Sequence, residues 1–378
     1  MKRILFVSTR NPFSNRFSGD IIGSKKIIGA LKKISTLDLV TLSDKEDFSQ
    51  KNIFIFKKPI LILQIFNIIK SLIFLKPLQF GLFHSKKMER FIQDRASDYD
   101  LIFFYHIRSS QYIPKNFYGE KIIEMGDLYS NNYNQTFYNL SVFNPLKYVY
   151  FFESLLMKKL EKKVFSIFDK IILFSNNEIK EVDKLFRKKT VQINVSTDKI
   201  KKKYIFSKNN NKILFIGNLK YLPNILAVRS FIKKVLPKLR KNLSDIKFEV
   251  VGEISSFNKF ILSSNKNVKC WGQQKNIDRF IKGSICGLAN LEIASGMQGK
   301  VLSYMSYGLP VICSKKTSHN FGKNVITYKD ENDLAVKINK LKNDKKFSNQ
   351  ISKKSLRFIN KFTWQKIKKE YLKIIKTQ

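Results

Sequence analysis

The sequence predicts an α/β protein of two domains, each with a parallel sheet covered by helices on both faces. Three observations favour this class. The chain has 378 residues, enough for two domains of ordinary size. Short apolar runs alternate with segments of helical period, which is the pattern of strands buried in a parallel sheet. The alternation also pauses at a polar stretch and then starts again, which indicates a domain boundary.

The first domain is expected over residues 1–204. It opens with a strand at 3–8, a loop that holds Pro12 and Gly19, and a helix that begins near Asp20. Later apolar runs predict six more strands, at 37–42, 52–56, 101–105, 121–125, 170–174 and 191–195.

The stretch 201–212 has few core-forming side chains and reads as a linker. A second domain is expected over 205–360, and a closing helix over 361–378 that packs back on the first domain. The second domain should contain a helix at 223–239 and strands at 213–217, 247–251, 268–271, 285–291 and 311–314, and a Lys-rich helical tail at 347–376 closes the chain. Such domains leave a cleft between them, and ligands bind at the carboxyl ends of the strands.

The charge is extreme, since 71 Lys and Arg face 29 Asp and Glu, a net charge of +42. Lys, Ile, Asn and Phe are abundant throughout, so most of this charge is expected to be solvated surface. An anionic membrane surface is a second interpretation. No helix-turn-helix, zinc-finger or RNP pattern accompanies the charge, so no nucleic-acid partner is expected.

Cysteine and histidine usage indicates a reducing compartment and no metal centre. The three Cys lie in or beside apolar runs without paired spacing, and the three His are scattered. The apolar run at the N-terminus is too short for a signal peptide. The residues concerned are Cys270, Cys286, Cys313, His84, His106 and His319.

Residues 60–75 read ILILQIFNIIKSLIFL, slightly short for a span of the bilayer. Gln64, Asn67 and Ser71 fall on one helical stripe, and Lys70 lies beside them. This pattern predicts a helix that either packs into a domain or lies on a membrane surface. The sequence leaves both alternatives open.

The strongest chemical signal is the segment LEIASGMQGKVLSYMSYGLPVI at 291–312. Ser295 to Gly299 form a glycine-bearing turn between a strand and a helix, with Lys300 in the first helical turn. Gly296 and Gly299 let a ligand approach the backbone closely, and the helix N-terminus offers unpaired N–H groups and partial positive charge. With the Lys300 ammonium added, the arrangement suits a diphosphate. The alternative is an ordinary strand–turn–helix unit with no ligand-binding role.

This segment resembles the donor-binding signature of glycosyltransferase family 4, Gly-x-x-x-Lys-x-x-Glu followed by Gly-x-Pro. The resemblance extends to 217–224 with Ala227, 248–252, Gly272, 277–280 and 362–364, while 124–130, 152–153 and Glu161 resemble a lipopolysaccharide-type branch. It implies the GT-B fold, with two Rossmann-like domains that face a central cleft. It also implies a donor site made of Gly217, Asn218, Ser295, Gly296, Met297, Gln298, Gly299, Lys300 and Ser303.

The chain departs from the family pattern at two positions. The family usually has Glu where this sequence has Ser303, and that Glu binds the nucleotide ribose. Many members also have Glu at the position of Ser295. A shorter, neutral side chain at 303 implies a weaker or water-mediated contact with the donor.

In the first domain the resemblance implies roles for residues that follow the predicted strands. Ser18, Gly19 and Asp20 stand where the family closes a loop over donor and acceptor, although Ser18 or Asp20 is equally suited to cap a helix. His106 stands near a family His that touches the donor sugar, and it is taken as catalytic together with Lys300. Arg108 and Asp127 are taken as acceptor-binding. A structural role for His106 and a capping role for Asp127 are the alternatives.

The resemblance implies a bacterial enzyme that transfers a hexose-type unit from a nucleotide sugar to a saccharide or lipid-linked glycan in cell-surface polysaccharide synthesis. Retention of anomeric configuration, no cofactor and no metal are implied as well. The expected location is the cytoplasm, with possible attachment to the inner face of the plasma membrane. Two rival functions are a GT-B nucleotide-sugar epimerase and a non-catalytic sugar-nucleotide-binding protein.

Overall fold

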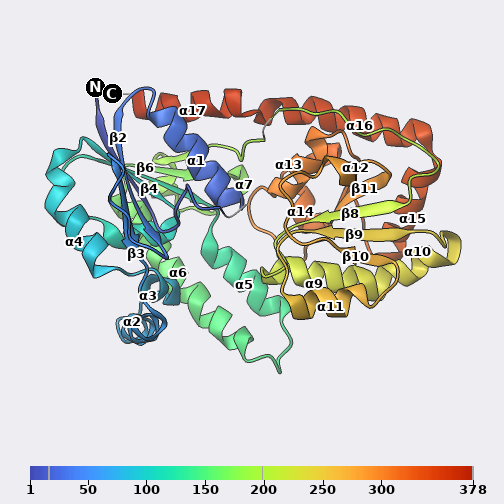
Figure 1. The fold of residues 1–378 in the computed structure, drawn as a ribbon, viewed down its shortest axis with the longest axis horizontal. Helices are drawn as coiled ribbons and strands as arrows, with labels where there is room; N and C mark the ends of the chain where they lie inside the picture. Colours follow the sequence, from blue (N-terminus) through green and yellow to red (C-terminus); the bar gives the residue numbers. More distant parts are fainter. Residues whose placement is uncertain (16–17, 198, 377–378) are drawn as a thin grey trace. The chain divides into compact units, whose positions relative to one another are not determined.

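The computed structural model describes residues 1–15, 18–197 and 199–376. The chain divides into two compact units, Met1–Asn194 with Lys368–Gln378, and Val195–Ile367. Each unit is an α/β body with a parallel sheet, as Figure 1 shows. The last two residues of the closing helix expected over 361–378 lie outside the described part. The predicted fold class, two α/β domains with parallel sheets, is confirmed.

The first unit contains, within the described residues, a seven-stranded sheet with the order β3-β2-β1-β4-β5-β6-β7, parallel throughout. All five residues of β4 are buried, because helices cover both faces of the sheet. The strands are β1 (Arg3–Ser8), β2 (Thr36–Ser43), β3 (Ile53–Lys57), β4 (Leu101–Tyr105), β5 (Glu120–Gly126), β6 (Lys170–Leu173) and β7 (Thr190–Gln192).

The helices of the first unit pack on this sheet around one core cluster, to which Leu5, Ile102, Phe104 and Ile123 belong. They are α1 (Gly19–Leu31), α2 (Leu61–Ile73), α3 (Leu78–Leu82), α4 (Lys86–Arg95), α5 (Tyr129–Asn139), α6 (Leu146–Ile167), α7 (Asn176–Glu181), α8 (Lys184–Arg187) and the 3₁₀ turns η1 (Ala96–Asp98) and η2 (Ile107–Tyr112). The end of α17 (Trp364–Lys376) joins them: the Tyr371 hydroxyl donates to Glu124 Oε2 on β5 at 2.5 Å.

The second unit has, in its described residues, a six-stranded parallel sheet with the order β10-β9-β8-β11-β12-β13. Its strands are β8 (Lys212–Ile216), β9 (Lys247–Val251), β10 (Val268–Cys270), β11 (Ser284–Ala289), β12 (Val311–Cys313) and β13 (Ile326–Thr327). Its helices are α9 (Leu222–Ser230), α10 (Leu236–Asn242), α11 (Ser256–Ser263), α12 (Asp278–Ile281), α13 (Gly299–Ser306), α14 (Lys315–Ser318), α15 (Glu331–Asn343) and α16 (Lys345–Ile359), with short turns η4 (Gly322–Asn324) and η5 (Asn360–Phe362).

Each sheet has one place where the strand order reverses. In the first unit this switch point lies between β1 and β4, and in the second unit it lies between β8 and β11. At a switch point the loops leave two adjacent strands in opposite directions, so a ligand finds room at their carboxyl ends. The loops after β1, β4, β8 and β11 are therefore the first places to look for function.

The structure differs from the expected elements in three places. The helix expected over 223–239 is interrupted by a π-helical segment, η3 (Phe231–Val235). Pro237 follows it in the first turn of α10 and lacks the N–H that would bond four residues back, which forces a wider turn. The Lys-rich segment 347–376 breaks at η5. The two-residue strand β13 was not expected, because two residues make no recognisable apolar run.

The stretch 201–212 is held to the second unit by backbone hydrogen bonds. Lys201 N donates to Ser306 O at 2.7 Å, and Tyr204 N donates to Tyr307 O at 2.9 Å. The ammonium groups of Lys201 and Lys203 both pair with Asp278. The composition of this stretch is typical of a linker, but its main chain is anchored at the C-terminal end of α13.

Candidate functional site

The turn after β11 in the second unit is held in shape by side-chain amides. Gly296 has a φ of +55°, which favours glycine, and its carbonyl accepts a hydrogen bond from Asn320 Nδ2 at 2.5 Å. Gln298 Nε2 donates to the carbonyl of Ser295 at 2.9 Å. Gln298 is the N-cap of α13 but makes no side-chain cap. The Gln298 side chain therefore does not cap the first N–H groups of this helix.

Lys300 lies in the first turn of α13, and its side chain is half-buried in the second unit. Its Nζ donates to Asn224 Oδ1 at 2.5 Å and lies 4.2 Å from the centroid of the Phe215 ring. Burial lowers the pKa of Lys300 to about 7. Among the described residues no carboxylate lies within 4.0 Å of this ammonium. A buried cation without an acidic partner is costly, and an anionic ligand would relieve that cost.

Asn224 joins the two loops that flank the switch point of the second unit. It is buried in the first turn of α9, and its Nδ2 donates to the carbonyl of Asn218 at 2.8 Å while its Oδ1 receives Lys300. A Cβ at Gly217 would come within 2.9 Å of Asn224 Nδ2, so glycine is required there. The predicted donor residues Gly217, Asn218 and Lys300 thus meet around one amide.

Ser303 lies one helical turn after Gly299 on α13 and is half-buried. Within the described residues its hydroxyl has no hydrogen-bond partner. The neighbouring Tyr304 is fully buried, and its hydroxyl accepts a hydrogen bond from Ile216 N at 2.6 Å. A Cβ at Gly287 would lie 2.4 Å from the Tyr304 ring. Tyr304 therefore fixes α13 against β8 and β11, while Ser303 stays available to a ligand.

In the first unit, residues after four neighbouring strands gather polar side chains. Arg10 follows β1, His106 and Arg108 follow β4, Asp127 follows β5, and Glu178 follows β6. Because the strands are parallel, these residues lie along the carboxyl edge of one sheet.

His106 is held at a strained backbone position at the end of β4, with a φ of +65°. Its Nδ1 lies 3.3 Å from the Tyr129 hydroxyl, and its buried Nε2 has no partner among the described residues. Burial and the neighbouring Arg108 lower the pKa of His106 to about 3. The ring is therefore neutral at physiological pH and can accept or donate one hydrogen bond.

Asp127 and Glu178 form a second pair of buried groups in the first unit. Glu178 Oε1 accepts from Leu128 N at 2.9 Å, whereas Glu178 Oε2 and Asp127 Oδ1 are buried without partners in the described chain. Burial raises the pKa of both carboxyls, and the neighbouring Asp127 raises that of Glu178 further. Asp127 does not cap α5, since Leu128 is the N-cap residue and no side-chain cap is made.

Arg108 packs its guanidinium 4.6 Å from the centroid of the Phe83 ring. Its Nε is buried without a partner among the described residues, and burial lowers the pKa of this guanidinium. Arg108 contributes a positive charge close to His106, as the lowered pKa of that imidazole indicates.

The Ser18–Asp20 segment begins α1 next to Arg10. Ser18 holds the N-cap position but makes no side-chain cap, and Gly19 is exposed. Asp20 pairs with Arg10 at 2.7 Å and its carbonyl accepts from the Tyr105 hydroxyl at 2.9 Å. Burial alone would raise the pKa of Asp20, but Arg10 outweighs it and the pKa falls to about 2. Asp20 is thus ionised and tied to the loop after β1.

Two acidic groups that the sequence brings to attention are engaged elsewhere. Glu124, in the segment 124–130 that carries part of the resemblance, accepts a hydrogen bond from the Tyr371 hydroxyl on α17 and is buried on β5. The chain also contains an Asp-x-Asp triplet, Asp98-Tyr99-Asp100. Asp100 Oδ2 accepts from Arg3 N at 2.7 Å at the start of β1, so the triplet lies at the amino ends of the strands.

Sequence reasoning did not single out Asn224, Tyr129 or Glu178. Asn224 had a signal, because it ends the segment 217–224 and follows Pro223 at a helix start. Glu178 had none, since a Glu in a short surface-like helix is ordinary in sequence and only the sheet brings it to Asp127.

Comparison with known proteins finds a family match within the second unit. Residues 210–344 match the family model described as glycosyl transferases group 1. That stretch contains β8, β11 and α13, and with them Asn218, Asn224 and Lys300. No curated protein matches the chain significantly.

Solved structures share the whole fold at low sequence identity. Anabaena HepE in complex with UDP and glucose is 12% identical with a TM-score of 0.67, covering 100% of both chains. A glycosyltransferase from Rickettsia africae is 12% identical with a TM-score of 0.62, covering 100% of this chain and 99% of that one. A variant of S. aureus TarM in complex with Fondaparinux, alpha-GlcNAc-glycerol and UDP is 10% identical with a TM-score of 0.65, covering 100% of both. The chain has the GT-B fold.

Proposed function

We propose that this protein is a glycosyltransferase that moves a sugar from a nucleotide-sugar donor to a hydroxyl of a saccharide or lipid-linked glycan. The observation that carries the proposal is Lys300, a half-buried ammonium with no acidic partner in the described chain, within a group 1 glycosyltransferase domain. The resemblance to family 4 and to its lipopolysaccharide branch supports the finer assignment to cell-surface polysaccharide synthesis.

The chemistry asks for stabilisation of the leaving diphosphate. When the bond from the anomeric carbon to the diphosphate breaks, negative charge grows on the diphosphate oxygens. The Lys300 ammonium and the N–H groups at the start of α13 are suited to receive this charge without reorganisation. We propose that Gly217 and Asn218 line the same donor site, that Ser303 takes the ribose contact, and that no metal is needed.

The first unit supplies groups suited to an acceptor. A neutral His106 and the unpartnered oxygen of Asp127 offer hydrogen bonds to sugar hydroxyls, and Arg108 offers a positive charge. We assign acceptor binding to Arg108 and Asp127 with the Ser18–Asp20 loop, a catalytic role beside the donor sugar to His106, and retention of anomeric configuration to the reaction.

A panel of sugar nucleotides tests the proposal. UDP-sugars come first, because HepE and TarM were crystallised with UDP. Purified protein is incubated with each radiolabelled donor and an extract of lipid-linked glycan, and the products are separated. Transfer of label or slow donor hydrolysis supports the glycosyltransferase. Epimerised donor would identify an epimerase, and nucleotide binding without turnover would identify a non-catalytic protein.

A further inference from the structure

Helix α2 of the first unit turns its apolar side chains outward. Ile62, Phe66 and Ile73 are 74%, 64% and 72% exposed. The polar stripe faces the other way: Ser71 is buried, and Gln64 and Asn67 are half-buried. Packing into a core, one of the two alternatives for 60–75, is therefore wrong.

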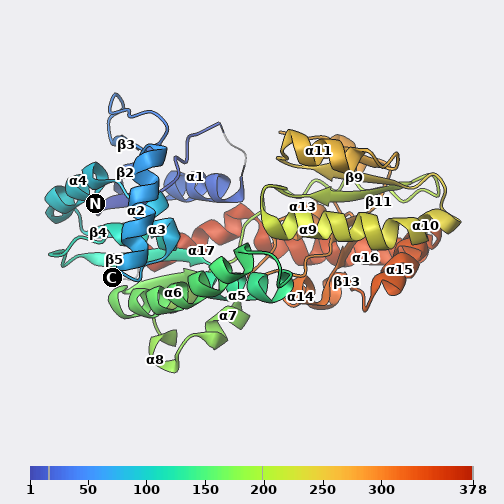
Figure 2. The ribbon, with the colours of Figure 1, turned by 90° about the horizontal axis from the view of Figure 1, so that it is seen from below.

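The inner face of α2 is fixed tightly to α3, its neighbour in Figure 2. A Cβ at Gly81 would come within 2.6 Å of the Asn67 backbone, so only glycine permits this contact. The close packing orients α2 and leaves the apolar side free. No described helix is long and apolar enough to cross a bilayer, and a helix with one apolar face is suited to lie within the interface.

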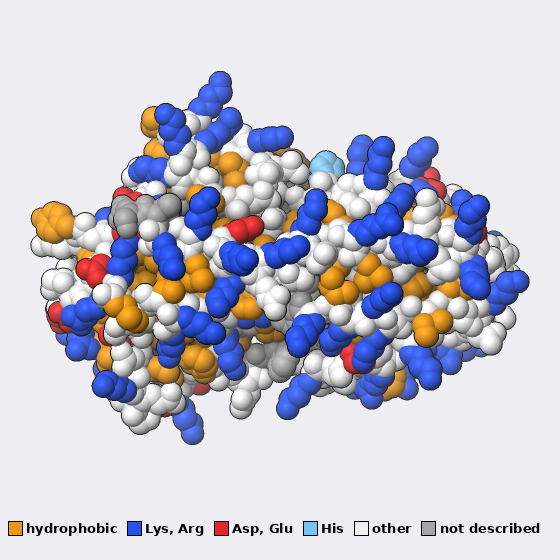
Figure 3. All heavy atoms as spheres, turned by 90° about the horizontal axis from the view of Figure 1, so that it is seen from above, with side chains coloured by type: hydrophobic (Ala, Val, Ile, Leu, Met, Phe, Trp, Pro, Cys, Tyr) orange, Lys and Arg blue, Asp and Glu red, His pale blue; other side chains and the backbone are white. Residues whose placement is uncertain are grey.

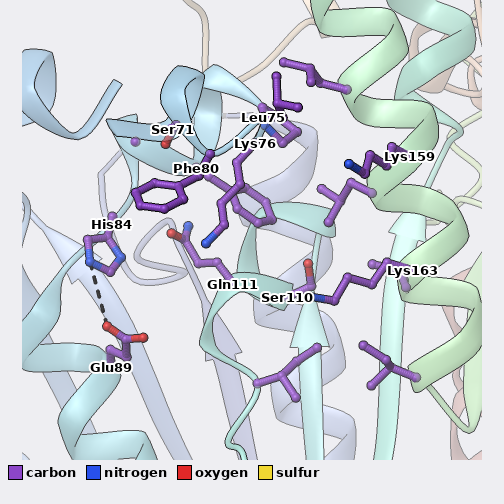
Figure 4. A pocket seen from close by; sticks show the side chains of 18 of the residues that line it. Ser71, Leu75, Lys76, Phe80, His84, Glu89, Ser110, Gln111, Lys159 and Lys163 are labelled. Carbon is purple, nitrogen blue, oxygen red and sulfur yellow. Dashed lines mark ion pairs between the residues drawn. The ribbon is translucent and has the colours of Figure 1, made fainter. Parts of the chain in front are cut away.

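A cavity of about 820 Å³ opens where this apolar helix ends. Phe74 and Leu75 line it and also belong to the exposed run of α2, so the cavity and the apolar surface are continuous. Figure 4 shows Lys76, Lys159 and Lys163 extending toward the cavity from two sides. Its six lysines are Lys70, Lys76, Lys115, Lys121, Lys159 and Lys163.

The charge of this cavity is not balanced by the protein. Its one lining carboxylate in the described chain is Glu89, which lies 3.8 Å from His84 Nε2. Lys121 has Asp169 at 3.9 Å, but the other five ammonium groups have no carboxylate within 4.0 Å among the described residues. Lysines that converge without counter-charges create a positive potential, which attracts an anion.

We propose that this cavity binds the phosphate headgroup of an anionic phospholipid, while the apolar face of α2 lies in the interfacial layer of the same bilayer. The two features need one ligand that is anionic at one end and apolar at the other. A phospholipid meets both conditions, because its phosphate reaches the lysines while its chains remain beside Phe74 and Leu75.

A second copy of this chain and a nucleic acid fit less well. A second copy would bring the same lysines against the first and add repulsion to a net charge of +42. The phosphate backbone of a nucleic acid would leave the apolar side of α2 without a contact. Lys and Arg side chains are also spread widely over the face shown in Figure 3, so general charge attraction must be separated from the cavity by a control.

Vesicle sedimentation provides the test, with wild-type protein and vesicles of phosphatidylglycerol and phosphatidylcholine or of phosphatidylcholine alone. The cavity variant is Lys159→Glu with Lys163→Glu, and both side chains are exposed, so the fold should survive. The matched control is Lys158→Glu with Lys162→Glu, which makes the same charge change on exposed positions of the same helix outside the cavity. We expect the cavity variant to lose at least about tenfold in partition to anionic vesicles, and the control less than about threefold.

A second variant tests the apolar side. Phe66→Asp should also weaken partition to anionic vesicles. Phe66→Trp, excited beside brominated lipid, should be quenched, since that residue lies in the interface. Circular dichroism checks that each variant is folded.

Three results would overturn the proposal: equal losses in the cavity variant and its control, equal binding to phosphatidylcholine alone, or no effect of Phe66→Asp. A dimer seen by sedimentation velocity and abolished by Phe66→Asp would assign the surface to a second copy instead. None of these measurements depends on glycosyl transfer, so their outcome neither supports nor contradicts the proposed function.

Discussion

The two sheets carry different side chains at equivalent edges. In the second unit this edge bears the loop after β11, and in the first unit it bears the loops after β4, β5 and β6. The second unit presents one ammonium group, that of Lys300, which contacts the Asn224 amide and the Phe215 ring. The first unit gathers a neutral imidazole beside Arg108 and, after the next two strands of the same sheet, two buried carboxyls with raised pKa values.

The difference teaches what each edge can bind. A lone cation in a half-buried setting discriminates strongly for an anion such as a diphosphate. A mixture of neutral hydrogen-bond donors and acceptors favours hydroxyl groups, because a hydroxyl can both donate to it and accept from it. Under the proposed function, the fold separates recognition of charge from recognition of hydroxyls, with one sheet for each.

Replacing Lys300 is expected to have the largest effect. Lys300→Met keeps the packing but removes the charge that we propose to meet the leaving diphosphate, so kcat should fall more than KM rises. A lost charge-assisted contact costs about 2–4 kcal/mol, or roughly a 30- to 1000-fold drop in rate. Steady-state kinetics measure this, with Lys323→Ala as an exposed control in the same unit. Near-normal transfer by Lys300→Met would remove the turn 296–300 from the donor site.

The pH dependence of nucleotide binding sharpens the same point. Burial lowers the pKa of Lys300 to about 7, so the free site loses its charge as pH rises above 7. A bound diphosphate favours the protonated amine, so affinity for UDP should fall between pH 7 and 9 by roughly 50-fold.

Titration calorimetry across that range checks the expectation. Lys300→Arg is the control, because a guanidinium stays charged throughout and should give a nearly flat profile. A flat wild-type profile would mean that Lys300 does not face the diphosphate.

Asp127→Asn tests the other side of the comparison. If Asp127 holds an acceptor hydroxyl, the KM for acceptor should rise about tenfold, since a hydrogen bond to a carboxylate is replaced by a weaker one to a neutral amide. Nucleotide affinity, measured by calorimetry, should not change. A variant that loses nucleotide affinity instead would show that the first-unit cluster serves the donor.

The sequence predicted the fold and the Lys300 turn for the same physical reason. Buried parallel strands are short apolar runs, and a glycine turn followed by Lys300 is a local feature that a linear reading can find. Asn224 lies 76 positions from Lys300, so their contact depends on the order of β8 and β11.

The first-unit cluster was predicted in part. His106 and Asp127 follow recognisable strands, but Glu178 reaches Asp127 only through the pairing of β5 with β6. The exposure of the apolar side of α2 could not be predicted from the sequence, because a buried and an exposed apolar face have the same residue pattern. The buried Ser71 and the tight contact at Gly81 show which side faces the protein.

A smaller effect is expected at Ser303. If its free hydroxyl is a weakened ribose contact, Ser303→Glu should tighten UDP binding by about fivefold without abolishing transfer, since one hydrogen bond contributes about 1 kcal/mol. Ser303→Ala should change little. Calorimetry and kinetics on both variants test this. Loss of binding in Ser303→Glu would mean that position 303 does not face the ribose.

The smallest expected effect is that of metal removal, and it bears directly on the comparison. If Lys300 and the start of α13 supply the positive charge, transfer should be undiminished in excess EDTA. Among the described residues the first unit offers a competing arrangement, since Asp127 and Glu178 have unpartnered oxygens that a divalent cation would satisfy. Loss of transfer in EDTA, restored by Mg²⁺ or Mn²⁺ in wild type but not in Asp127→Asn, would place a cation at that pair. The two sheets would then both present positive charge to the substrates, and the division between charge and hydroxyl recognition would fail.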